Sequence, residues 1–259
     1  MKISLQNRKK QNIIGALSKP EKVIGTCVIQ HGYGGFKEQD HMQVMQDVFL
    51  KHGFQTFNFD ATNSIGESDG DYEQATLGLH YEDFEDVTNW VQSQEWFVAP
   101  LAVIGHSMGG YAVARYAEDY PGKVAYCLPI APVVSGKLTF DAHEINDPEG
   151  FARWKETGML EKESESRPGY IKRQPWSHME ERLDHDLVPH ASKLIMPTFL
   201  YVGSQDTSIL PEHVKMLFDA IPDGNKTYIE AEGAPHTYRT TEDLSFLGHS
   251  IDRWLNSKV

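Results

Sequence analysis

The chain has 259 residues, of which 40% are hydrophobic, and a formal net charge of −13 at pH 7. This length and apolar content suit one large α/β domain with room for an insertion. The strong negative charge argues against nucleic acids and anionic membrane surfaces as partners, because long-range repulsion opposes their approach.

Residues 1–10 are polar and basic and lack the apolar core of a secretory signal. No window reaches the roughly 18 consecutive apolar residues of a membrane span. We therefore expect a soluble, cytoplasmic protein. Cys27 and Cys127 each lie inside an apolar, strand-like run, which predicts buried free thiols and no disulfide framework.

The order of strand and helix patterns predicts an α/β fold with a mainly parallel central sheet and helices on both faces. The first twenty residues look like a short antiparallel hairpin. Further strands are expected at Val23–Gln30, Phe54–Phe59, Leu101–Gly105, Val124–Pro129, Thr198–Gly203 and Lys226–Glu230.

Helices are expected between these strands, where apolar residues recur at amphipathic spacing. They are Asp40–His52, Tyr81–Gln94, Ser107–Tyr120, Pro211–Ala220 and Glu242–Leu255. The first two are interpreted as having acidic first turns, and the fourth begins with a proline at a tolerated position.

Residues 134–194 break this alternation, because they contain no pattern of a central strand. The segment is rich in charge but carries many large apolar side chains. These are Phe140, Phe151, Trp154, Met159, Leu160, Tyr170, Trp176 and Met179. We interpret 134–194 as an inserted cap or lid on a core formed by 1–133 and 195–259. A plainer alternative is that these residues only attach the insertion to the body of the protein.

Residues 101–109 form an apolar run that ends in Gly-His-Ser-Met-Gly, with Ser107 at its centre. This spacing is typical of a nucleophile elbow, in which glycines at 105 and 109 leave room for a sharp turn from strand to helix. Ser107 is therefore the candidate nucleophile. The alternative is an ordinary strand-to-helix turn.

A serine hydroxyl needs a base to take its proton and an acid to orient that base. His236 is the candidate base, because it follows a loop with Gly and Pro after the last strand and precedes the last helix. Asp206 is the candidate acid at the end of strand 198–203, with Asp141, expected in the loop after the preceding strand, as the fallback. Asp206 lies 99 residues after Ser107 and 30 before His236, so the insertion falls between nucleophile and acid.

Acyl transfer also needs donors aimed at the developing oxyanion. A glycine-rich turn follows strand residues 28–30, and the backbone N–H groups of Tyr33 and Met108 are the candidate pair. No G-x-G-x-x-G spacing is present, so a phosphate-binding loop is disfavoured. His31 and His106 are expected to support these turns rather than to act as bases.

The insertion also contains a cluster of histidines and carboxylates, the side chains that commonly bind metals. Its members are His178, Glu180, Glu181, Asp184, His185 and His190. Their spacing gives no H-E-x-x-H motif and no cysteine partner, so a solvated helix face is preferred and no metal is expected.

With His31-Gly32, the elbow 105–109, Asp206 and His236 in place, the chain resembles the α/β-hydrolase superfamily over nearly its full length. Residues 59–70 and the opening hairpin 7–20 are similar to small bacterial carboxylesterases, with cinnamoyl or feruloyl esterases, monoacylglycerol-lipase-like and serine-aminopeptidase-like enzymes as relatives. The turn at Asp60 lacks the usual arginine and first glycine. The resemblance implies an acyl-enzyme hydrolase without a cofactor.

The leading hypothesis is a serine esterase for a small-molecule ester whose aromatic or short-to-medium acyl group lies under the cap. Amide or peptide, thioester and carbon–carbon bond hydrolysis use the same residues and stay open. An aminopeptidase would need carboxylates near the pocket, for which Glu144, Asp147 and Glu149 are candidates. An alternative of another class is a ligand-binding receptor on a hydrolase scaffold.

Overall fold

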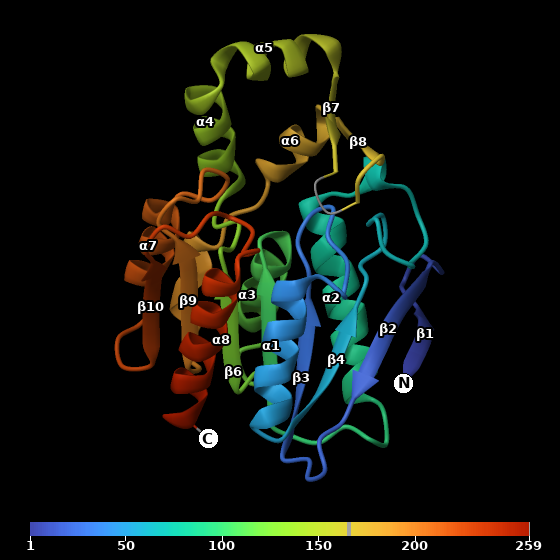
Figure 1. Ribbon diagram of the computed structural model, residues 1–259, viewed down its shortest axis with the longest axis vertical. Coiled ribbons are helices and arrows are strands. Elements are labelled where there is room, and N and C mark those ends of the chain that lie inside the picture. The colour runs from blue at the N-terminus through green and yellow to red at the C-terminus, as the bar shows by residue number, and fades with distance from the viewer. Residues whose placement is uncertain (165–166, 259) are drawn as a thin grey trace.

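The computed structural model describes residues 1–164 and 167–258. An eight-stranded sheet with the order β1-β2-β4-β3-β5-β6-β9-β10 runs through the molecule (Figure 1). Its strands are β1 (Lys2–Gln6), β2 (Asn12–Ser18), β3 (Gly25–Gln30), β4 (Phe54–Phe59), β5 (Leu101–His106), β6 (Tyr126–Ile130), β9 (Thr198–Gly203) and β10 (Lys226–Ala231). All neighbouring pairs from β4 to β10 are parallel, whereas β1 and β2 form an antiparallel hairpin whose second strand runs antiparallel to β4.

The predicted α/β fold, the hairpin and the six predicted strands are confirmed, with strand ends shifted by no more than two residues. Every residue of β3, β4, β5 and β9 is buried. These strands are buried on both sides because helices cover both faces of a parallel sheet, and β5 and β9 are accordingly mostly apolar.

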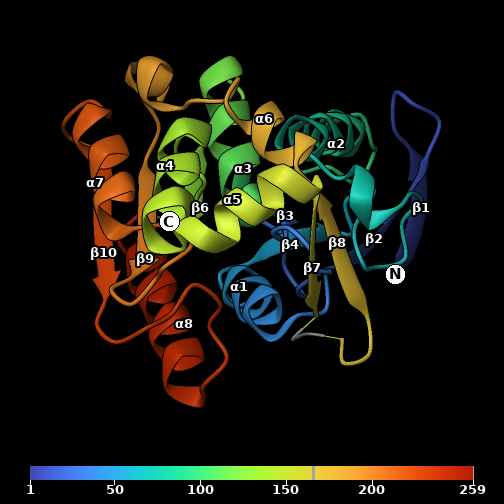
Figure 2. The same ribbon diagram turned by 90° about the horizontal axis from the view of Figure 1, so that it is seen from above.

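Two helical layers enclose the sheet (Figure 2). Helices α1 (Asp40–Lys51) and α8 (Thr241–Asn256) contribute to the apolar core on one face. Helices α2 (Leu77–Gln92), α3 (Met108–Asp119) and α7 (Pro211–Ala220) contribute to the core on the other. A short 3-10 helix, η1 (Tyr72–Gln74), precedes α2.

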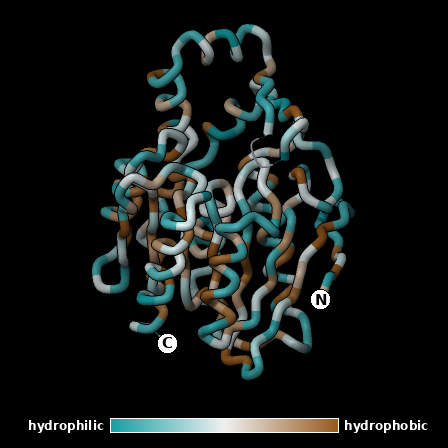
Figure 3. Tube along the Cα trace, viewed as in Figure 1, coloured by the Kyte–Doolittle hydropathy of each residue, from teal (hydrophilic) through white to brown (hydrophobic). Residues whose placement is uncertain are grey.

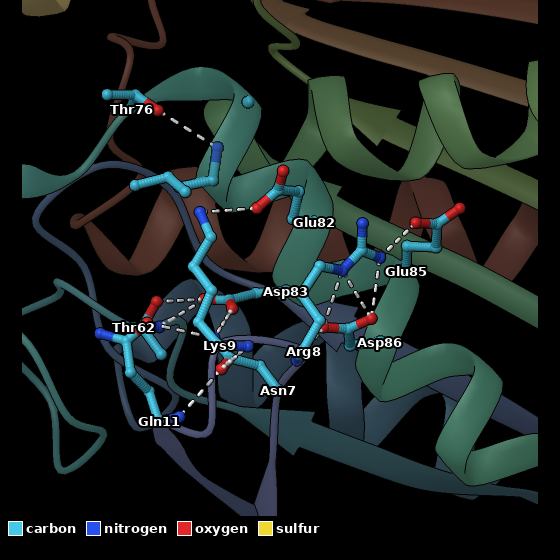
Figure 4. A network of polar contacts seen from close by, with 12 residues as sticks. Asn7, Arg8, Lys9, Gln11, Thr62, Thr76, Glu82, Asp83, Glu85 and Asp86 are labelled. Carbon is cyan, nitrogen blue, oxygen red and sulfur yellow. Dashed lines mark hydrogen bonds and ion pairs between the residues drawn. The ribbon is translucent and has the colours of Figure 1, made fainter.

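Helix α2 begins four residues earlier than predicted, at Leu77, and its first turn is not acidic. Thr76 caps the helix by accepting a hydrogen bond from the Leu79 amide at 3.2 Å. The prediction of an acidic first turn was wrong, because the earlier start of the helix places its acidic residues in the second turn and later. There Asp83 accepts hydrogen bonds from Asn7 of the β1–β2 connection and from Thr62 (Figure 4).

The described residues between β6 and β9 add no strand to the central sheet. It forms α4 (Gly136–Asn146), α5 (Pro148–Thr157), β7 (Met159–Glu163), β8 (Ile171–Pro175), α6 (Ser177–Arg182) and a 3-10 helix, η2 (Val188–Lys193). β7 and β8 pair with one another, and α4, α5, α6, β7 and β8 rise above one end of the sheet (Figure 1).

Five of the eight large apolar side chains named for this segment pack with one another in a cluster separate from the cores on the two faces of the sheet, so they do not simply attach the segment to the body. Phe151, Trp154, Trp176 and Met179 are buried together, with Phe140 against them. Figure 3 shows that apolar stretches are concentrated in the body of the molecule, below α4 and α5. The division into a core and a cap stays a prediction.

Both cysteines, Cys27 and Cys127, are buried free thiols, as predicted. Within residues 1–164 and 167–258, none of the helices has both the length and the apolar character required to cross a bilayer.

Candidate active site

Ser107 lies at the junction of β5 and α3 with a strained backbone of φ 57° and ψ −115°. This is the left-handed region of φ, which non-glycine residues rarely adopt. The neighbouring glycines have no room for side chains. A Cβ on Gly105 would lie 2.3 Å from the Gly109 carbonyl oxygen, and one on Gly109 would lie 2.3 Å from that of Gln30. The strand, the sharp turn and the helix therefore have the arrangement of a nucleophile elbow.

The structure brings Ser107, His236 and Asp206 together from three separate loops. His236 Nε2 lies 3.0 Å from Ser107 Oγ, and His236 Nδ1 lies 2.7 Å from Asp206 Oδ2. The Nδ1–H donates to the carboxylate, so Nε2 is left to accept the serine proton. Asp206 is buried, and its Oδ1 accepts hydrogen bonds from the amides of Ser208 and Ile209, both at 2.8 Å.

Asp141, the fallback acid, is not part of this arrangement. It lies on α4, not in a loop as expected, and it pairs with Lys137 one helical turn away. Its position is therefore that of an intrahelical ion pair, and Asp206 alone of the two contacts His236.

The candidate oxyanion donors belong to the two turns that meet at Ser107. The turn after β3 passes close to the serine, since a Cβ on Gly32 would lie 2.8 Å from Ser107 Cβ. Within the described ranges, neither the Tyr33 nor the Met108 amide donates a recorded backbone or side-chain hydrogen bond. Met108 is also the first residue of α3, where the helix dipole favours negative charge.

His31 and His106 support the turns, as predicted. His31 Nε2 accepts a hydrogen bond from the Ala61 amide at 3.0 Å, and its Nδ1–H donates to the Gly32 carbonyl at 2.7 Å. His106 Nε2–H donates to the His236 carbonyl at 2.8 Å. Burial lowers the pKa of both imidazoles, so they remain neutral in the core.

Ser107 and His236 open into a cavity of about 650 Å³. The segment between β6 and β9 and the loops at the carboxyl ends of the strands both line it. Four of its described lining residues are cationic and two are carboxylates. They are Lys162, Lys172, Arg182 and Arg239, with Glu163 and Asp243.

The interpretation of the histidine and carboxylate cluster in the insertion as a solvated helix face holds for Glu180 and Asp184, which are exposed, but is wrong for His178 and Glu181. His178 is buried and donates from Nδ1 to the Ala75 carbonyl at 2.6 Å. Glu181 accepts hydrogen bonds from the amides of Leu77 and Gly78 at the start of α2. These side chains join α6 to α2. In the part of the chain that the structure describes, no three metal-binding side chains cluster.

Arg182 is the cavity residue that sequence reasoning missed. It is the last residue of α6 and lines the cavity with Ser107. The signal in the sequence is its spacing of four from His178, which it contacts. By contrast, Glu144, Asp147 and Glu149 do not line this cavity, and Asp147 caps α5.

A mainly parallel sheet, with a strained serine turn after β5 and its histidine and aspartate after later strands, defines an α/β hydrolase. The model of the family described as serine aminopeptidase, S33, matches residues 21–162, more than half of the chain. The chain belongs to this family, and it is a hydrolase of the α/β-hydrolase superfamily.

Two relatives are similar to the chain over most of its length. An uncharacterized 31.7 kDa protein of Escherichia coli is 24% identical over 81% of this chain and 82% of its own length. Mitochondrial palmitoyl-protein thioesterase ABHD10 of mouse is 24% identical over 78% of this chain and 65% of its own.

Solved structures share the fold. Est1E of Butyrivibrio proteoclasticus, solved with ferulic acid bound, matches with a TM-score of 0.80 and 18% identity over 99% of this chain and 98% of that one. Mouse α/β-hydrolase domain-containing protein 10 matches with a TM-score of 0.79 and 20% identity over the full length of both chains.

Proposed function

We propose that this hydrolase cleaves carboxylic esters through a covalent acyl-enzyme. The observation that carries the proposal is the hydrogen-bonded series from Ser107 through His236 to Asp206, with distances of 3.0 and 2.7 Å. This is the geometry in which a serine hydroxyl loses its proton as it attacks a carbonyl carbon.

In this mechanism, Ser107 Oγ attacks the ester carbonyl while His236 Nε2 takes the serine proton. Asp206 holds the imidazole in the required tautomer and stabilises its protonated form. The amides of Tyr33 and Met108 stabilise the oxyanion. His236 then gives its proton to the leaving alcohol, and a water molecule cleaves the acyl-enzyme by the reverse sequence of proton transfers.

We also propose that residues 134–194 act as a cap over the site. Leu160, Gln174 and Arg182, all from this segment, line the cavity that contains Ser107. An aromatic or short-to-medium acyl group would lie beneath them. The ferulic acid bound to Est1E is an aromatic acid, which supports this choice.

The family description names aminopeptidases, but the cavity favours esters. An aminopeptidase must hold a protonated amine, and cations outnumber carboxylates among the described lining residues. A thioester is the second candidate, because the mouse relative is a palmitoyl-protein thioesterase.

The test is steady-state hydrolysis of nitrophenyl esters from acetate to laurate, with methyl ferulate, an acyl thioester and an aminoacyl anilide alongside. We expect ester turnover that Ser107→Ala abolishes, while its thermal unfolding stays cooperative. Turnover of the thioester alone, or of the anilide alone, would contradict the ester proposal and indicate a thioesterase or an aminopeptidase, respectively. No turnover of any substrate by folded protein would favour a ligand-binding receptor.

A further inference from the structure

Arg182 is a buried cation beside the candidate nucleophile. Its side chain lines the same cavity as Ser107, although the residue is only 7% exposed. Its Nε and Nη2 lie 3.1 and 2.8 Å from His178 Nε2, and Nη2 lies 3.7 Å from Met108 Sδ. Met108 directly follows Ser107, so the guanidinium contacts the residue proposed to stabilise the oxyanion.

The charge of Arg182 is not balanced by an ion pair. His178 donates from Nδ1 to the Ala75 carbonyl, so its Nε2 accepts from the arginine, and burial lowers the pKa of His178 to about 3. This imidazole is therefore a neutral partner. Within residues 1–164 and 167–258, no carboxylate lies within ion-pair distance of Arg182. A buried cation without a counter-ion is costly, which indicates that an anion completes the site.

Glu181 is the carboxylate whose charge acts on Arg182. Both of its oxygens are already engaged, one by the Leu77 amide at 3.1 Å and the other by the Gly78 amide at 2.8 Å. The second oxygen also lies 2.7 Å from His185 Nε2. Glu181 thus caps α2 and does not bond to the guanidinium.

Two phenol side chains lie next to Arg182. The rings of Tyr33 and Tyr72 stack with their centroids 4.5 Å apart, and both side chains line the cavity. The buried hydroxyl of Tyr33 interacts with that of Tyr72 and has no other hydrogen-bond partner in the described residues. Burial raises the pKa of both phenols, so they stay protonated and can donate to an anion.

The position of Arg182 is fixed by its surroundings. A Cβ on Gly136 would lie 1.6 Å from the Arg182 carbonyl oxygen, so the start of α4 packs directly on the arginine backbone. His143, another cavity residue, has its pKa lowered by burial and by the charge of Arg182. Packing of Gly136 therefore fixes the Arg182 backbone, and the hydrogen bonds to His178 hold the guanidinium.

We propose that Arg182, together with the hydroxyls of Tyr33 and Tyr72, binds a carboxylate carried by the substrate while the ester carbonyl lies at Ser107. This inference rests on the ester hydrolysis proposed above and specifies its substrate class. Because Arg182 contacts Met108, the carboxylate lies a short distance from the scissile bond. The substrate is then a monoester of a dicarboxylic acid, or an ester whose alcohol carries the carboxylate.

The test compares matched neutral and anionic esters by pH-stat titration. In the first pair, monomethyl adipate carries a carboxylate on the acyl side and methyl hexanoate carries none. In the second pair, 4-carboxyphenyl acetate carries a carboxylate on the alcohol side and phenyl acetate carries none. For one of these pairs, we expect Arg182→Met to lower the ratio of kcat/KM, anionic over neutral, by about 10- to 100-fold. The pair that responds identifies the side that bears the carboxylate.

Arg173→Met is the matched control, because Arg173 lies on β8, is exposed and pairs with Glu161. It removes the same charge and leaves the ratio within twofold. Tyr33→Phe removes only a hydroxyl and should lower the same ratio severalfold, so it tests the site even if Arg182→Met does not fold. A ratio unchanged in both Arg182→Met and Tyr33→Phe, for both ester pairs, would overturn the inference.

Binding of adipate to the Ser107→Ala protein, measured by calorimetry, separates this inference from the proposed function. Adipate binding that is lost with Arg182→Met supports the anion site even if no ester is cleaved. If neutral esters are cleaved, but neither adipate binding nor the preference for anionic esters depends on Arg182, the proposed esterase activity is supported and the anion site is refuted. Arg182-dependent binding of inorganic phosphate but not of adipate would overturn the choice of a carboxylate.

Discussion

His106 Nε2 donates a hydrogen bond to the backbone carbonyl of His236 at 2.8 Å. His106 immediately precedes Ser107, so this bond links the loop of the proposed base to the turn of the proposed nucleophile. The two imidazole rings also lie 4.8 Å apart. Since burial keeps His106 neutral, its single N–H is committed to this bond. His106 is thus a positioning residue for His236.

Replacing His106 by Phe keeps an aromatic ring beside His236 but removes the donor. We expect kcat for ester hydrolysis to fall about 10-fold with KM changed less than twofold, because one hydrogen bond that aligns the base is lost. His249→Phe, on the exposed side of α8, is the control. An unchanged kcat in folded His106→Phe would show that the bond is not needed for alignment.

Asp206→Asn tests the assignment of the acid. The amide oxygen of Asn can still accept from Ser208 and Ile209, so the loop should keep its fold. The side chain no longer carries the charge that selects the Nδ1–H tautomer of His236, and we expect kcat to fall about 10⁴-fold. Asp141→Asn should leave kcat within twofold. The reverse pattern would make Asp141 the acid.

Much of this architecture was predictable because it is encoded locally. The strands Leu101–His106 and Thr198–Gly203 are short, mostly apolar runs bounded by turn residues, and such runs indicate buried strands without further information. The turn at Ser107 is similar, since the glycines at 105 and 109 are dictated by backbone packing within a few residues. Local patterns of this kind also placed Asp206 and His236 at strand ends.

The parts that were missed depend on contacts between distant residues. The start of α2 at Leu77 and Gly78 is completed by Glu181, more than 100 residues further along the chain. In the sequence, Glu181 stands in a polar run that resembles a solvent-exposed helix. Arg182 was overlooked for the same reason, because only the tertiary fold brings a charged side chain of α6 next to Met108.

Glu118 on α3 predicts a pH-dependent stability. Its side chain is buried, neither carboxylate oxygen has a hydrogen-bond partner in the described residues, and burial raises its pKa to about 8. The folded state therefore binds this proton more tightly than the unfolded state, and the free energy of unfolding falls as pH rises from about 4.5 to about 8. Arg115, 3.9 Å away, opposes the shift only in part.

Glu118→Gln removes the cost of ionising this buried group. We expect the variant to be more stable than the wild type at pH 8.5 by about 2 kcal/mol, with the difference shrinking towards pH 5. Urea unfolding across this range measures it, with Glu95→Gln on the surface as the control. Parallel stability curves for wild type and Glu118→Gln would contradict a raised pKa.

The elbow predicts that Gly109 tolerates no side chain. Gly109→Ala would place a Cβ 2.3 Å from the Gln30 carbonyl oxygen, which belongs to β3 and cannot move cheaply. We expect a loss of about 1 to 3 kcal/mol in unfolding free energy and a large loss of turnover. At Gly122 nothing lies within 4 Å of the added Cβ, so Gly122→Ala should be close to neutral. Similar losses in both variants would contradict the steric argument.

Lys37 and Asp60 form a buried ion pair that anchors the turn after β4. Lys37 Nζ lies 2.8 Å from Asp60 Oδ2, and their side chains are 5% and 0% exposed. Lys37→Met leaves the buried carboxylate without its cation, so we expect a loss of about 3 to 5 kcal/mol in unfolding free energy. Lys2→Met, which breaks an exposed pair with Glu67, should cost less than about 1 kcal/mol. Adding Asp60→Asn to Lys37→Met removes the unpaired negative charge, and we expect the double variant to regain part of the lost unfolding free energy. A double variant no more stable than Lys37→Met would show that the loss comes from packing and not from the unpaired carboxylate.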